Sequence, residues 1–62
     1  MGAASQQAII EYLETHGPAT FYELMRLKYR EQTIAKAVRA LLEAGRVVEV
    51  DDGVIVRIML AP

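Results

Sequence analysis

The most regular segment of the chain is EQTIAKAVRALLEAGRV, residues 31–47. Its aliphatic residues recur at helical spacing, because stepping about 100° per residue from Ile34 brings Val38, Leu41 and Leu42 within about 80° of it. The opposite side carries Gln32, Lys36, Arg39 and Glu43. This spacing predicts an amphipathic helix over residues 31–44. Gly45 then supplies the left-handed residue that commonly follows a helix.

Two β-branched runs follow this helix, at residues 47–50 and 54–60, on either side of Asp51-Asp52-Gly53. An Asp-Gly pair between such runs is a strong local signal for a β-hairpin, which we predict over residues 46–60. A two-residue turn at Asp52-Gly53 would place Val50 opposite Ile55, Val48 opposite Arg57 and Arg46 opposite Met59, whereas a three-residue turn would change this pairing. The other face of the hairpin would hold Val47, Glu49, Val54, Val56, Ile58 and Leu60.

Two further helices are predicted before residue 31. The first spans residues 5–16, with Ser5 as its N-cap and Gly17-Pro18 at its end. The second spans residues 20–28 and begins with a capping box, in which the Thr20 hydroxyl and the Glu23 carboxylate each accept a hydrogen bond from a backbone amide. Four aromatic residues lie at helical spacings and are expected to be core or half-buried: Tyr12, Phe21, Tyr22 and Tyr29.

The order of these elements, three helices followed by a hairpin, predicts an α+β fold with one domain over residues 1–62. In this order and in several short motifs the chain resembles the winged-helix family of helix-turn-helix domains. The motifs around the third helix are Thr33-Ile34, Val38, Leu41 and EAGRV at residues 43–47. The motifs at the join of the first two helices are HGPAT at residues 16–20 and Glu23-Leu24. The resemblance implies a three-helix winged helix-turn-helix with a C-terminal β-hairpin wing.

The resemblance also implies that the third helix is a recognition helix, which lies in the major groove of double-stranded DNA. The residues suit that role, because Gln reads adenine, Lys and Arg read guanine, and small side chains contact a thymine methyl group. The expected DNA-binding residues are Gln32, Thr33, Lys36 and Arg39 at base edges or nearby phosphates, and Arg26, Lys28, Arg30 and Arg46 at phosphates. We therefore expect a small DNA-binding protein, a transcriptional regulator or accessory factor. The alternative is a winged helix that serves as a protein-interaction module and does not bind DNA.

The charge distribution is uneven along the chain. Seven basic and eight acidic residues give a net charge of −1 at pH 7, which by itself argues against a strong polyanion binder. Residues 26–39 nevertheless hold five cations and Glu31 as the only anion, a local net charge of +4. The hairpin instead carries Glu49, Asp51 and Asp52 at its tip. Because these carboxylates would repel phosphates, we do not expect the wing to contact DNA.

Two cations depart from the winged-helix pattern. Where the family often has a Gly in the turn and a Ser or Asp as the cap of the third helix, this chain has Lys28 and Arg30. A cation at a helix N-terminus opposes the helix dipole. Either a bound phosphate relieves this conflict, or Glu31 in the first turn balances Arg30 and no ligand is involved.

Composition narrows the remaining function classes. With no Cys and a single His, the chain has neither a disulfide framework nor a Cys-ligated zinc site. Its one Ser, isolated glycines and dispersed carboxylates form no catalytic or phosphate-binding motif, so we expect a non-enzyme without a cofactor or small-molecule effector.

No apolar run approaches the roughly 18–20 residues of a membrane span, and residues 1–5 lack the features of a signal peptide. A cytoplasmic location is expected, associated with the nucleoid if the protein binds DNA. A hydrophobic content of 53% is high for so short a chain. It predicts a homodimer formed through the hairpin or the first helix.

Overall fold

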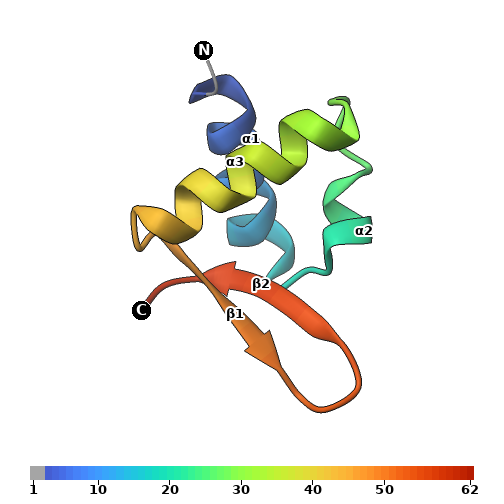
Figure 1. Ribbon diagram of the computed structural model, residues 1–62, viewed down its shortest axis with the longest axis vertical. Helices are drawn as coiled ribbons and strands as arrows, with labels where there is room; N and C mark the ends of the chain where they lie inside the picture. The colour runs from blue at the N-terminus through green and yellow to red at the C-terminus, as the bar shows by residue number, and fades with distance from the viewer. Residues whose placement is uncertain (1–2) are drawn as a thin grey trace.

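The computed structural model describes residues 3–62 and contains three helices followed by a two-stranded antiparallel sheet. The elements are α1 (Ala3–His16), α2 (Phe21–Leu24), α3 (Glu31–Glu43), β1 (Val47–Asp51) and β2 (Val56–Leu60). In Figure 1, α3 lies across α1, and the hairpin of β1 and β2 extends away from the helices. This α+β arrangement is that of a helix-turn-helix with a β-hairpin wing, so the predicted fold class is confirmed.

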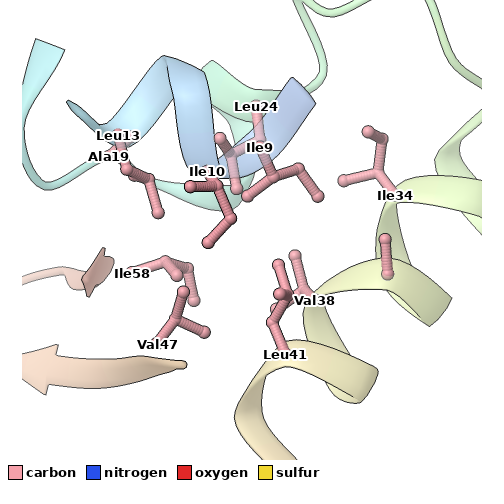
Figure 2. Packing of buried hydrophobic residues seen from close by; sticks show 11 residues of the cluster. Ile9, Ile10, Leu13, Ala19, Leu24, Ile34, Val38, Leu41, Val47 and Ile58 are labelled. Carbon is pink, nitrogen blue, oxygen red and sulfur yellow. The ribbon is translucent and has the colours of Figure 1, made fainter. Parts of the chain in front are cut away.

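One hydrophobic core joins the three helices to the base of the hairpin. From α3, the side chains of Ile34, Val38 and Leu41 point toward Ile9 and Ile10 of α1 (Figure 2). The other buried members of the cluster are Leu13, Ala19, Leu24, Ala37, Val47 and Ile58. The predicted inner face of α3 is therefore the buried one, which leaves the opposite face of this helix to solvent.

The first helix begins earlier than predicted. It starts at Ala3, so Ser5 lies inside the helix and is not its N-cap. Ser5 is only 3% exposed and lies one turn before the fully buried Ile9, on the face that packs against the core. Alanine at positions 3 and 4 favours the additional helical residues. The predicted end is correct, because Gly17 has φ +79° and its N–H donates to the Leu13 carbonyl at 2.8 Å.

The second helix has the predicted capping box but ends at Leu24 instead of residue 28. The Glu23 N–H donates to the Thr20 hydroxyl at 3.1 Å, and the Thr20 N–H donates to the Glu23 carboxylate at 2.9 Å. Residues 25–29 form tight turns. Both Leu27 and Tyr29 pack against the core, and side chains two positions apart cannot share one helical face. Continuing the helix would turn one of them away from the core.

The hairpin has a longer turn than predicted, and its register is shifted by two residues. Val50 lies opposite Arg57 and Val48 opposite Met59, and residues 52–55 form the loop. The cause is the side chain of Asp52, whose Oδ1 accepts from the amides of Val54 and Ile55 at 2.9 Å each. A shift of two residues changes every partner but keeps each side chain on its predicted face.

A third segment, which no local sequence pattern predicts, also pairs with the sheet. Ala19, in the join between α1 and α2, forms an isolated antiparallel bridge with Ile58 of β2. The Ala19 N–H donates to the Ile58 carbonyl at 2.9 Å, and the Ile58 N–H donates to the Ala19 carbonyl at 2.7 Å. Both residues are almost fully buried. The bridge therefore fastens the base of the hairpin to the helices.

Candidate nucleic-acid interface

The exposed face of α3 carries the central residues of the predicted interface. Gln32, Lys36 and Arg39 are all exposed, and they lie opposite the buried residues of the same helix. Thr33 is only half-buried at the side of the helix. The sequence therefore placed three of these four side chains where a large ligand can reach them, and Thr33 at the margin.

A shallow hollow lies on this exposed face. It has a volume of about 200 Å³ and is lined by Ala35, Lys36 and Arg39. Ala35 is exposed, and its small side chain leaves room beside the two longer cationic ones. The hollow thus presents a methyl group next to two positive charges.

The turns that lead into α3 present three more cations. Arg26, Lys28 and Arg30 are exposed, and they alternate with Leu27 and Tyr29, which face the core. This alternation holds all three cations on the outside. Together with Lys36 and Arg39 they form what we call the basic strip, which follows the second half of the helix-turn-helix.

The cations of the basic strip are not neutralised by ion pairs. Within residues 3–62, the structure contains a single ion pair, between Arg57 and Asp52 at 3.1 Å. Arg26 lies close enough to Glu23 to help lower the pKa of that carboxyl, although hydrogen bonding from the Thr20 backbone N–H is the main cause of the shift. The strip therefore offers its charge to an external anion.

The N-terminus of α3 has no side-chain cap. Arg30 occupies the N-cap position with extended backbone and makes no capping hydrogen bond through its side chain. Glu31 is the acidic residue of the first turn. The structure therefore contains both the uncapped N-terminus, which would bind a phosphate, and Glu31, which would balance the charge of Arg30 without a ligand.

Arg46 is not brought together with the other predicted phosphate contacts. It is exposed just after α3, where its N–H donates to the Leu41 carbonyl at 2.9 Å and its carbonyl accepts from the Ala61 N–H at 3.0 Å. A helix of 13 residues is about 20 Å long. Arg46 therefore lies at the far end of α3 from Arg26, Lys28 and Arg30.

The tip of the hairpin is both acidic and apolar. Glu49, Asp51 and Asp52 are exposed. Asp52 is bound locally, since its carboxylate accepts from two backbone amides and from Arg57, and these bonds lower its pKa, the amides of Ile55 and Val54 most of all. Four large aliphatic residues are exposed around these acids: Val54 at 92%, Val56 at 44%, Val50 at 42% and Ile55 at 39%.

The prediction that Tyr22 is a core or half-buried residue is wrong. The residue is 86% exposed on α2. Its neighbours Phe21 and Leu24 define the inner side of this short helix, and residue i+1 of a helix points away from the face of residue i. The exposure of Tyr22 could have been predicted from its position directly after Phe21. Its hydroxyl lies on the surface of the helix-turn-helix.

Comparison with known proteins gives no match: no family model, curated protein or solved structure matches this chain. None of the helices in residues 3–62 is long and apolar enough to cross a membrane.

Proposed function

We propose that this protein binds double-stranded DNA by inserting α3 into the major groove, as a transcriptional regulator or accessory factor. The observation that carries the proposal is the exposure of Gln32, Lys36 and Arg39 on the face of α3 that lies opposite the core. An α-helix fits the major groove, and these side chains are those that read base edges there. The protein acts without enzymatic activity or a cofactor, in the cytoplasm and at the nucleoid.

Each part of the basic strip has a distinct role in this proposal. Lys36 and Arg39 contact guanine O6 and N7 or adjacent phosphates, and Gln32 contacts adenine. Arg26, Lys28 and Arg30 neutralise phosphates at one end of α3. Thr33 contacts the groove wall from the side of the helix, and Arg46 contacts a phosphate at the other end. The acidic hairpin stays away from the duplex because its carboxylates repel phosphates.

A second copy of the chain joins through the hairpin. Of the two dimer surfaces that the sequence suggested, the hairpin is favoured because it carries four of the exposed large hydrophobic residues of the described chain, whereas α1 carries none of them. Burial of this apolar surface drives association. A dimer also provides the two half-sites that a small domain needs for useful affinity.

The experiment is a titration of fluorescently labelled duplex DNA, with binding measured by anisotropy at two salt concentrations. About four phosphate contacts per subunit predict a log–log salt slope near −4 per subunit. The double variant Lys36→Gln with Arg39→Gln should weaken binding at least about tenfold, because it removes the contacts to guanine.

The matched control is Ala4→Glu with Thr15→Glu, which changes the net charge by the same amount on the exposed side of α1. Its effect should be small. Equal losses of DNA affinity in the two double variants would show that net charge alone explains the weakening. Unchanged DNA binding in the Lys36→Gln, Arg39→Gln variant would overturn the proposal.

A second candidate function is a protein-interaction module that does not bind DNA. It is favoured by the exposed aliphatic residues and the carboxylates of the hairpin tip. The two candidates are separated by one pair of measurements. An absence of binding to random duplex DNA at low salt, together with a stable complex whose interface includes the hairpin, would select the interaction module.

A further inference from the structure

The outer edge of β1 is an open strand edge, and the hydrogen-bond pattern of the hairpin shows which residues face it. The Arg46 carbonyl accepts from the Ala61 N–H at 3.0 Å. In an antiparallel ladder, bonded pairs alternate with non-bonded ones. The bonded pairs after this one are therefore Val48 with Met59 and Val50 with Arg57.

An independent observation confirms this alternation. Ile58 uses both its N–H and its carbonyl to bond Ala19, on the side of β2 that faces away from β1. Its partner Glu49 must then direct its own N–H and carbonyl away from β2. The same holds for Asp51, two residues further on.

These outward backbone groups are accessible over a short length of β1. Val47 has the same orientation but is only 1% exposed, whereas Glu49, Val50 and Asp51 are all exposed. Within residues 3–62, no backbone hydrogen bond joins Glu49 or Asp51 to a further segment. Figure 1 shows this part of β1 projecting from the body of the protein. The edge can therefore accept another strand between residues 48 and 51.

The charges on this edge exclude two kinds of occupant. Phosphates are repelled by Glu49 and Asp51. A second copy of β1, paired antiparallel and centred on residue 49, would place the two Glu49 side chains directly opposite each other. If the copy is shifted by two residues in one direction, Glu49 of each strand lies opposite Asp51 of the other. If it is shifted in the other direction, Glu49 of each strand lies opposite the buried Val47 of the other. Like charges directly opposite each other destabilise a strand pair.

We propose that the outer edge of β1 binds an extended peptide segment of a partner protein in which basic and β-branched aliphatic residues alternate. Glu49 and Asp51 lie on one face of the hairpin, and Val48 and Val50 lie on the other. A strand added beside them places its basic residues next to the two carboxylates and its aliphatic residues next to the two valines. Backbone hydrogen bonds hold the segment, and the alternation gives specificity.

The test is independent of DNA binding, because no nucleic acid is present. A ¹⁵N-labelled sample of the full chain is titrated with a six-residue peptide that alternates lysine and valine, and amide hydrogen exchange is measured by NMR. We expect the amides of Glu49 and Asp51 to become protected. A peptide that alternates glutamate and valine serves as the control and should protect neither.

Two variants at one position separate backbone pairing from charge attraction. Glu49→Gln removes the charge and keeps the outward N–H, whereas Glu49→Pro removes the same charge and also that N–H, which the hairpin does not use. We expect Glu49→Pro to bind the lysine peptide about 3- to 10-fold more weakly than Glu49→Gln does. Circular dichroism checks that both variants fold, and the exchange measurement on the unaltered chain does not depend on either.

Three results would overturn the inference. The first is equal affinity of the two variants together with no protection of Glu49 and Asp51. The second is equal binding of the acidic and the basic peptides. The third is protection of Glu49 and Asp51 that rises with protein concentration in the absence of peptide, which would assign this edge to a second copy of the chain.

Discussion

Shortening Ile58 to alanine should destabilise the protein far more than shortening Val56, although both lie on the same face of β2. Ile58 is 4% exposed and Val56 is 44% exposed. Ile58→Ala removes three carbon atoms, worth roughly 2.4 kcal/mol at about 0.8 kcal/mol for each buried one. The cavity that remains brings the expected loss to about 2–5 kcal/mol. Val56→Ala removes two carbons from a half-exposed site, so its loss should be about 1 kcal/mol or less.

The size of these losses matters because the chain is small. With 62 residues, its free energy of unfolding is expected to be about 3–9 kcal/mol, and Ile58→Ala removes a large part of it. Ile58→Val is the graded variant, with an expected loss of about 0.5–1.5 kcal/mol. Urea unfolding followed by circular dichroism gives the midpoints, compared at constant m value. Equal losses at positions 56 and 58 would refute the description of a hairpin anchored only at its base.

Three local features give further predictions. Thr20→Ala removes the cap of α2 and should cost about 1 kcal/mol, seen as a fall of about 4–8 °C in the midpoint of thermal unfolding; an unchanged midpoint would contradict the capping box. Gly45→Ala should cost about 1 kcal/mol, because φ is +73° while nothing within 4 Å obstructs the added carbon, and wild-type stability in urea would disprove the left-handed conformation. The pKa values of Asp52 and Glu23 are lowered from their ordinary values of 3.8 and 4.5, chiefly by backbone N–H donors, so their contribution to stability is complete above these values and is lost as the pH falls below them. Unfolding midpoints measured from pH 6 to pH 2 should fall less steeply in Asp52→Asn than in the unaltered chain.

The parts of the fold that the sequence predicts well are those set by neighbouring residues. The inner face of α3 follows from the spacing of Ile34, Val38 and Leu41, and the end of α1 follows from Gly17. The capping box of α2 is likewise a local signal. In each case residues within one or two helical turns determine the structure, so the pattern can be read directly.

The errors arise where a side chain or a distant segment competes with the local pattern. Asp52 redirects the turn by accepting from two amides, and this enlarges the loop and shifts the register. Leu27 and Tyr29 end α2 early because both are required by the core. The pairing of Ala19 with Ile58 depends on how the whole chain is folded, and no neighbouring residue signals it.

For the candidate interface, too, local patterns predict some features, whereas others depend on the whole fold. The helical period predicts which of its side chains face solvent, so the exposure of Lys36 and Arg39 could be anticipated. Arg46 was predicted to contact phosphates together with Arg26, Lys28 and Arg30 because of its charge, but the length of α3 places it at the other end of this helix. The open edge of β1 required the register itself, since one bonded pair determines the direction of every later backbone group.

The bridge between Ala19 and Ile58 also affects how the protein is made. The ribosome synthesises a chain from its N-terminus to its C-terminus, so all three helices emerge from the ribosome before residue 58 does. Until then the apolar side chains of α1 lack the strand that packs against them, and Ala19 lacks Ile58 as the partner of its backbone groups. Pairing across so much of the sequence is slow compared with helix formation. Helix α3 is therefore synthesised well before it is held in position, and the emergence of β2 completes the hairpin.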